Sequence, residues 1–207
     1  MHYTLSSRWI ASALLGVLLL LGSAVPAAAQ GQSTAQDIRT MLEERDQQIK
    51  SILKGADDYT TEQRQELKTL INGVIDFRAM GQTALGPFWG DLSNEQQTEF
   101  VDVFRDVVRA QSLSDLEVYN SQVTFDQITV EDDSAYVRTT TTYQGSKTPV
   151  EYVLERQEET WRAEDIIVDG VSTAEGYARS FQNVVRKRGF DALMTSLKKK
   201  RDQVQSS

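Results

Sequence analysis

The stretch IIVDGVSTAEG, residues 166–176, joins a strand-like run to the start of a helix. Its apolar run ends at Val168, Asp169-Gly170 is a typical turn pair, and an amphipathic pattern opens after Ser172. The same order of strand, sharp turn and helix surrounds the nucleophilic serine of many hydrolases. The chemistry of Ser172 is therefore the first question that the sequence raises.

The expected mature chain lacks the residue types that would activate Ser172 as a nucleophile. The only histidine is His2, which lies in an expected leader segment, and the chain has no cysteine. The mature chain therefore lacks the residues for a Ser-His-Asp triad, a Cys-His pair, a histidine-ligated zinc or a haem. Ala174 also stands where the G-x-S-x-G elbow needs glycine. We interpret Ser172 as a helix cap and expect no enzyme, metal or cofactor.

The N-terminus has the pattern of a cleaved secretory signal peptide. Arg8 precedes an apolar stretch at residues 10–25, and alanines at 27 and 29 form an A-x-A ending. We expect cleavage after Ala29, a single mature domain over residues 30–207, and a periplasmic location. A retained membrane anchor is the alternative, but the apolar stretch is shorter than the roughly 20 residues of a spanning helix.

The charge of the chain limits its partners. The formal net charge is −8, and loss of Arg8 with the leader makes it −9. An acidic protein is poorly suited to binding nucleic acid or an anionic lipid surface through bulk electrostatics. We therefore expect recognition by shape and apolar contact, and no nucleic acid.

Periodicity predicts helices, then strands, then helices. Helical spacings cover residues 30–55 and 61–75, a Ser93–Gln96 capping box opens a helix that reaches about Leu116, and two helices that meet at Gly189 close the chain. Between them, four alternating segments joined by short turns predict an antiparallel meander with a bulge near Asp126-Gln127. The fold class is α+β: a curved four-stranded sheet wrapped by amphipathic helices.

Two sets of charged residues could have a function. Asp165 with Asp169, or Asp132 with Asp133, could form a catalytic carboxylate pair, although turn aspartates usually serve the backbone. The KKKR run at residues 198–201 could dock a partner, although it also suits the end of a helix. A hydrolase that uses a carboxylate pair therefore stays open as an alternative.

The positive signal is an excess of apolar surface. At least five amphipathic helices accompany a sheet that needs one helical layer, and the aromatic residues are numerous. The excess fits a large filled core or a cavity roofed by helices. Periodicity does not choose between these two.

The last third of the mature chain resembles the end of the MlaC family, periplasmic phospholipid-binding proteins also called toluene-tolerance auxiliary proteins. The matching residues are Trp161, Asp165, Gly170, Val171, Ser172, Tyr177, Arg179, Phe181, Gly189 and Leu193. An upstream block also resembles the family, at Phe77, Met80, Leu85, Gly86, Trp89, Gln96, Phe100 and Phe104. The second strand, rich in threonine, is unusually polar for the family.

The resemblance implies a fold similar to that of nuclear transport factor 2, with acyl chains between the sheet and the helices. It also implies a monomeric shuttle for phospholipid between an outer-membrane lipoprotein and an inner-membrane ABC transporter complex with an MCE-domain subunit, which maintains outer-membrane lipid asymmetry. Transfer of an acyl chain of about 15 methylenes into water costs roughly 12 kcal/mol at about 0.8 kcal/mol per methylene. A dry cavity would remove most of that barrier.

Strand parity and helix stripes suggest the lining of this cavity. The candidate lipid-binding residues are Phe104, Val108, Val137, Tyr143, Val150, Tyr152, Leu154, Ile167, Val171, Tyr177 and Phe181. The sequence does not separate residues that line a cavity from residues that pack a core. Two non-enzymatic alternatives stay open: a carrier of another apolar lipid such as a hopanoid, and a structural domain that binds a partner without any ligand.

Overall fold

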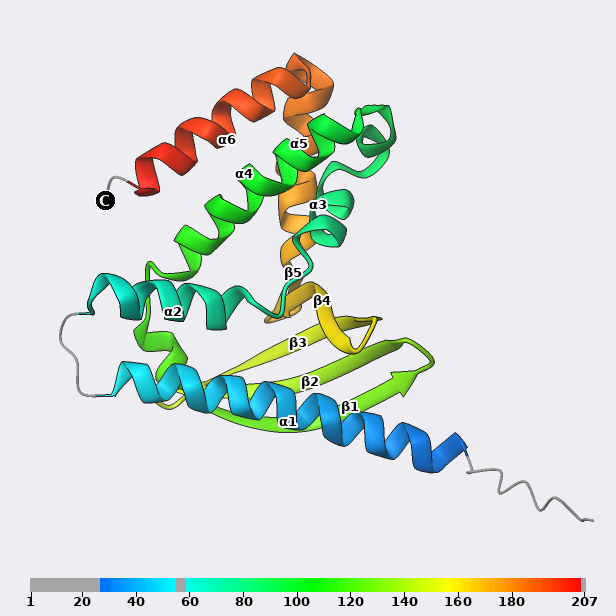
Figure 1. The fold of residues 1–207 in the computed structure, drawn as a ribbon, viewed down its shortest axis with the longest axis vertical. Helices are drawn as coiled ribbons and strands as arrows, with labels where there is room; N and C mark the ends of the chain where they lie inside the picture. The colour runs from blue at the N-terminus through cyan, green and yellow to red at the C-terminus, as the bar shows by residue number, and fades with distance from the viewer. Residues whose placement is uncertain (1–26, 55–58, 206–207) are drawn as a thin grey trace, which may run out of the picture.

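The structure is a computed structural model that describes residues 27–54 and 59–205. The long first helix packs across a curved sheet, and a group of helices stands over the end of that sheet formed by the strand Thr160–Val168 (Figure 1). The expected signal peptide, residues 1–29, falls mostly outside the described residues. None of the helices described is long and apolar enough to cross a membrane.

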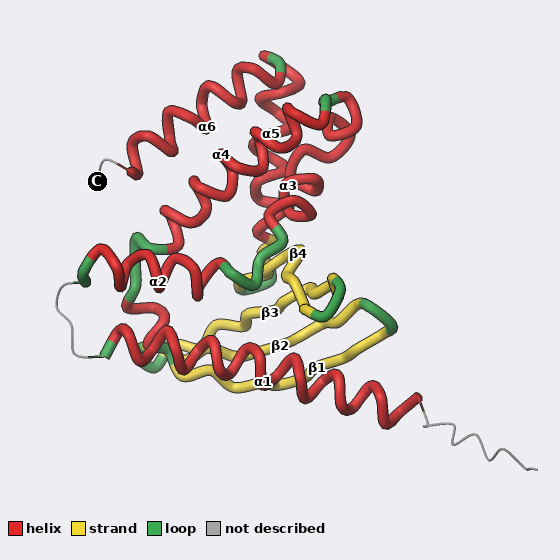
Figure 2. Tube along the Cα trace, in the orientation of Figure 1, coloured by secondary structure: helices red, strands yellow, loops and turns green. Residues whose placement is uncertain are grey.

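The chain order is helices, sheet, helices, as the sequence predicts (Figure 2). The elements before the sheet are α1 (Ala27–Leu53), α2 (Thr61–Asn72), α3 (Phe77–Leu85), the 3-10 turn η1 (Gly86–Asp91), α4 (Asn94–Ser112) and the 3-10 turn η2 (Glu117–Asn120). The strands are β1 (Gln122–Glu131), β2 (Ser134–Tyr143), β3 (Ser146–Gln157), β4 (Thr160–Val168) and β5 (Val171–Ser172). The last elements are α5 (Thr173–Arg188) and α6 (Phe190–Gln205).

The helix ends follow local sequence signals. Ser93 and Gln96 form the predicted capping box of α4, and Thr60 with Gln63 forms a second one on α2. Gly189, at φ 84°, follows the last residue of α5 as expected. The fourth helix is shorter than predicted, because α4 ends at Ser112 and a separate 3-10 turn leads into the sheet.

The sheet is antiparallel in the order β1-β2-β3-β4-β5, so it has one strand more than the four predicted. The extra strand has two residues and pairs Val171 with Val168 across the turn at 169–170. The predicted bulge is confirmed, since the β1–β2 register shifts between Phe125 and Gln127. A second, unpredicted bulge shifts the β3–β4 register at Glu164.

Two large apolar clusters hold the layers together. In one, Ile38 and Leu42 of α1 pack with Val137 and Leu154 of the sheet. The other joins α3, η1, α4, α5 and α6 around the stacked rings of Phe100 and Phe104, whose centroids are 5.6 Å apart. Each cluster buries the apolar faces of its helices or strands, whose exposure to water would be unfavourable.

A short bridge connects these clusters at the edge of the sheet. Backbone N–H of Asp76 donates to the carbonyl of Ala163 at 2.8 Å, and N–H of Ala163 donates to the carbonyl of Val74 at 2.7 Å. Ile75 packs against both clusters. The bridge also pairs part of the β4 edge, which would otherwise present free backbone groups.

Candidate functional site

The 166–176 stretch folds as a strand, a turn and a helix start, and Ser172 caps that helix. Its Oγ accepts a hydrogen bond from N–H of Glu175 at 3.0 Å and donates one to Asp165 Oδ2 at 2.5 Å. Asp165 Oδ1 also accepts from N–H of Ile166 at 2.9 Å and of Ala174 at 3.0 Å. Both side chains therefore serve the backbone at the N-terminus of α5, where the free N–H groups need acceptors.

An open apolar groove of about 610 Å³ lies beside this helix start. We call it the α5–α6 groove. Its lining consists of Val107, Val168, Val171, Ser172, Thr173, Gly176, Tyr177, Ser180, Phe181, Val184, Leu193, Ser196, Leu197 and Lys200. Cavities of roughly 300–1,000 Å³ with mainly apolar walls are typical of small-molecule sites.

The mouth of the α5–α6 groove exposes apolar surface. Val168 is 44% exposed and Val171 is 57% exposed, which places them among the large apolar residues most open to solvent in the described chain. They are cross-strand partners, and Val168 is also the partner of Val150. Exposed valines beside an apolar hollow leave surface that a ligand or partner could cover.

A row of residues continues from this mouth across the whole sheet. The register pairs Phe125 with Thr139, Thr139 with Val150, Val150 with Val168, and Val168 with Val171. Direct partners in an antiparallel sheet point to the same face. The groove is therefore continuous with a stripe on one face of the sheet.

The threonines of β2 make this face less polar than the sequence suggests. Thr139 is buried and its hydroxyl donates to the carbonyl of Val150 at 2.7 Å, while the hydroxyl of Thr141 donates to the carbonyl of Thr148 at 3.0 Å. Because these hydroxyl protons bond to the neighbouring strand, neither hydroxyl has a donor left for a ligand.

The structure divides the eleven candidate residues into groups. Val171, Tyr177 and Phe181 line the α5–α6 groove. Phe104 and Val108 are buried in the helical cluster, and Val137 and Leu154 are buried beneath α1. The remaining sheet residues are half-buried: Tyr143, Val150, Tyr152 and Ile167.

Ile167 lies on the opposite face of the sheet from the other candidates in strands β2 and β3. Its partner is Glu151, whereas Ile166 pairs with Tyr152. The bulge at Glu164 changes the side-chain parity of β4, so Ile166 takes the position that simple alternation gives to Ile167. The bulge left no clear mark in the sequence, because residues 166–168 are all apolar.

Three half-buried tyrosines have poorly hydrated hydroxyls. Desolvation raises the pKa of Tyr152 to about 12, with a further contribution from the charge of Asp46. Desolvation also raises the pKa of Tyr119 to about 12. It raises the pKa of Tyr177 as well. The Tyr177 hydroxyl donates to Gln111 Oε1 at 3.0 Å, which orients the ring within the groove wall.

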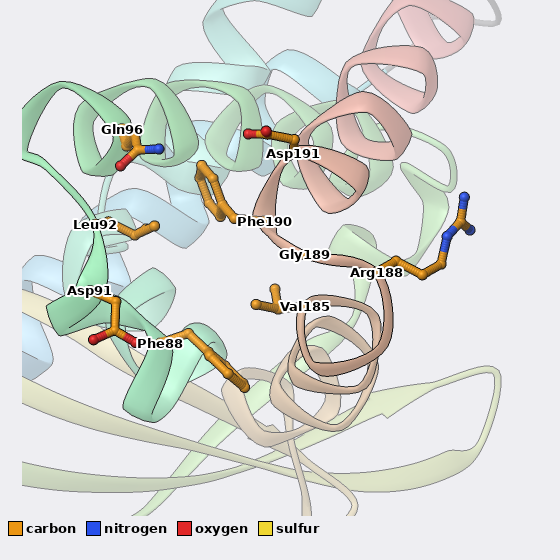
Figure 3. Close-up of a pocket in the computed structure, with 9 residues that line it drawn as sticks. All are labelled: Phe88, Asp91, Leu92, Gln96, Val185, Arg188, Gly189, Phe190 and Asp191. Carbon is orange, nitrogen blue, oxygen red and sulfur yellow. The ribbon is translucent and has the colours of Figure 1, made fainter.

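A second, smaller hollow of about 370 Å³ lies at the other end of the helical layer (Figure 3). Phe88, Leu92, Val185 and Phe190 give it an apolar floor between η1, α4 and the α5–α6 turn. Asp91, Asp191 and Arg188 stand around it, and the Arg188 side chain points away from it in Figure 3. It contains none of the candidate residues, so we treat the α5–α6 groove as the functional site.

The sequence patterns did not identify several of the residues that line the groove. Val107, Val184, Leu193 and Leu197 belong to apolar helical stripes, which predict burial without saying whether a core or a cavity follows. Lys200 belongs to the basic run that we interpreted as a solvated helix end. In the described residues, no group of three His, Cys, Asp or Glu side chains is arranged to hold a metal ion.

Comparisons with known proteins agree with this architecture. A solved structure of a phospholipid-binding protein from Ralstonia solanacearum, in complex with a phospholipid, aligns with a TM-score of 0.66 and 23% identity. The alignment covers 81% of this chain and 96% of the Ralstonia chain, which shows that the two share a fold. A search of curated proteins found no match.

The family comparison covers the whole sheet and the apolar cluster of the helical layer, together with most of the cluster beneath α1. Residues 43–199 match the family described as MlaC protein. This match includes the α5–α6 groove except for Lys200, together with both sequence blocks that suggested the resemblance. The chain belongs to the MlaC family.

Proposed function

We propose that this protein binds a phospholipid and carries it across an aqueous space between two membranes. The observation that carries the proposal is the α5–α6 groove, whose walls are mainly apolar and whose mouth is open. Membership of the MlaC family and the fold shared with a phospholipid-binding protein support the same ligand class. Binding of this kind needs shielding from water, and no covalent step.

The acyl chain occupies the α5–α6 groove in this proposal. Val171, Tyr177 and Phe181, with Leu193 and Leu197 of α6, contact its methylenes. Each methylene removed from water contributes about 0.8 kcal/mol, so the length of chain covered sets most of the affinity. The stripe through Val168 and Val150 gives a second path for acyl carbons along the sheet.

The wider role follows the family. The protein works in the periplasm after removal of residues 1–29, as a monomer with a fold similar to nuclear transport factor 2. It receives or delivers phospholipid at an outer-membrane lipoprotein and at an inner-membrane ABC transporter complex with an MCE-domain subunit. This traffic would maintain the lipid asymmetry of the outer membrane.

Organic extraction and mass spectrometry of the natively purified mature protein test the ligand. We expect phospholipid in the extract at a substantial fraction of the protein. A hopanoid or another apolar lipid in its place would change the ligand class, and an extract without lipid from a folded protein would contradict the proposal.

A pair of valine variants tests the groove. Val171→Asp puts a carboxylate at the mouth, and desolvation of that charge should lower co-purified phospholipid by more than about tenfold. Val118→Asp is the matched control, because Val118 is 40% exposed and lies in η2 outside the groove. Equal lipid content in two folded variants would place the acyl chain elsewhere.

A further inference from the structure

The charge on the lining of the α5–α6 groove is positive. Among the described residues that line it, Lys200 is the only charged side chain. This is unusual for a chain with a formal net charge of −8, where acidic side chains outnumber basic ones. A lone cation at an apolar groove creates a place where an anion is favoured.

Lys200 has no carboxylate partner in the part of the chain that the structure describes. Its neighbours in the basic run are engaged: Lys198 Nζ lies 2.6 Å from Glu99 Oε1, and Arg201 Nη2 lies 2.8 Å from Asp202 Oδ1. Lys200 makes no such ion pair, so its three N–H donors are free to bind a ligand. Lys200 therefore differs from Lys198 and Arg201 because it lines the groove without an ion pair.

The polarity of the groove changes along its length. Helices α5 and α6 meet at Gly189 and diverge from there (Figure 1). Val184 and Leu193 lie within five residues of this turn, whereas Thr173 and Lys200 lie far along the two helices. Lys200 is therefore separated along α6 from the apolar lining near this turn.

A second cation, Arg179, lies beside the α5 wall of the groove. Arg179 Nη2 comes within 3.9 Å of the position that a Cβ at Gly176 would take, and Gly176 lines the groove. Arg179 is exposed and makes no ion pair with any described carboxylate. It adds positive charge beside the groove without lining the groove itself.

These features match an amphiphile with an apolar tail and an anionic head. We propose that Lys200 binds the phosphate of a phospholipid whose acyl chain occupies the α5–α6 groove. This assignment rests on the proposed function and adds the position of the headgroup. The phosphodiester is the group recognised, so lipids with different substituents on the phosphate should share the interaction.

Displacement of a fluorescent acyl probe from delipidated protein tests the assignment. The competitors are dioctanoyl phosphatidylglycerol, dioctanoyl phosphatidylcholine and dioctanoylglycerol. All three have the same acyl chains, the first two carry a phosphodiester, and dioctanoylglycerol has none. Lys200→Gln should weaken both phospholipids about fivefold, the factor expected for one unit charge about 4 Å from another in water. Its affinity for dioctanoylglycerol should stay the same.

Lys199→Gln is the matched control, since Lys199 is exposed, has the same charge and does not line the groove. It should leave all three affinities unchanged. The fivefold effect at Lys200 should also shrink in about 1 M salt, where the screening length is about 3 Å.

The experiment distinguishes failure of the phosphate assignment from failure of the proposed lipid binding. If the wild-type protein binds all three lipids and Lys200→Gln changes the phospholipids no more than dioctanoylglycerol, the phosphate assignment is wrong and lipid binding stands. If Lys199→Gln has the same effect as Lys200→Gln, diffuse charge explains the preference and the assignment is also wrong. If the folded wild-type protein binds none of the lipids, the proposed function fails as well.

Discussion

At the scale of single residues, Asp165 and Ser172 show how a catalytic-looking pair can be structural. The carboxylate of Asp165 accepts two backbone N–H groups and the Ser172 hydroxyl, and that hydroxyl in turn accepts the N–H of Glu175. The network ties the end of β4 to the first turn of α5. It fixes the direction in which α5 leaves the sheet, and so the position of the groove.

Removal of this network should therefore lower stability. We expect Ser172→Ala to reduce the free energy of unfolding by about 1 kcal/mol, as for other helix caps, and Asp165→Ala by about 1–3 kcal/mol because it leaves buried donors unpaired. The double variant should lose less than the sum of the two, since the residues share one hydrogen bond. Urea unfolding measures all three.

Ser180→Ala is the control for these variants, because Ser180 is an exposed residue later in α5. It should change the free energy of unfolding by less than about 0.5 kcal/mol. Additive losses at positions 165 and 172 would show that the two side chains act independently.

Tyr152 gives the fold a dependence on alkaline pH. Its pKa is raised to about 12 in the folded protein, against about 10 in an unfolded chain. Below about pH 10 the hydroxyl keeps its proton in both states, so its contribution to stability is constant. Between about pH 10 and 12 the unfolded state loses the proton first, so stability should fall as the pH rises.

Comparison of the wild-type protein with Tyr152→Phe isolates this effect. Urea unfolding at several pH values from about 9 to 12 should show a steeper loss of stability in the wild-type protein than in the variant. Other tyrosines and lysines titrate in both proteins, so only the difference between the two profiles matters. Parallel profiles would mean that Tyr152 is well hydrated.

At the scale of elements, β2 shows that a threonine-rich strand can line an apolar face. Thr139 and Thr141 direct their hydroxyl groups to carbonyls of β3, while Thr140 has its hydroxyl at the surface, 2.7 Å from Asp126 Oδ2. β-branched side chains also suit the pleated surface. The hydroxyl donors of Thr139 and Thr141 are therefore used within the sheet.

Thr139→Val tests this description of the strand. We expect a loss of about 1 kcal/mol in the free energy of unfolding, because the hydrogen bond to the Val150 carbonyl disappears. Phospholipid content should not fall, since valine has the same shape and is more apolar. Thr140→Val is the control and should change stability by less than about 0.5 kcal/mol. Lipid loss in Thr139→Val would indicate that the hydroxyl contacts the ligand.

At the scale of the whole molecule, the arrangement leaves an apolar hollow beside well-packed clusters. Phe100 and Val137 are fully buried in their clusters, while Val168 and Val171 stay exposed between the sheet and the helices. A ligand that covers these valines would stabilise the folded state alone. Lipid content should then be visible in the thermal stability of the whole protein.

Removal of lipid should lower the Tm of the wild-type protein, and return of phospholipid should restore it. Ligand at about 100 times its Kd contributes about 2.7 kcal/mol to the free energy of unfolding. Val171→Asp should show a much smaller increase on addition of lipid, and Val118→Asp should behave as the wild-type protein. Differential scanning calorimetry measures each increase. An unchanged Tm in the wild-type protein would contradict binding to the folded state.

Sequence patterns alone determined the order of elements, the capping of α4 and α5, the β1 bulge and the family. These features depend on neighbouring residues, such as the reach of Ser93 to Gln96 or of Ser172 to Glu175. Local hydrogen bonds and periodicity are therefore enough to predict them.

Tertiary structure decided which apolar residues are core and which line the groove. Phe104 and Phe181 have the same helical periodicity, yet only Phe181 lines the groove. The bulge at Glu164 placed Ile166 where simple alternation expects Ile167, and the packing of α5 and α6 made Lys200 part of the groove lining. Periodicity reports only that a side chain leaves water. The space that receives it depends on how distant elements pack, and that is settled by the whole fold.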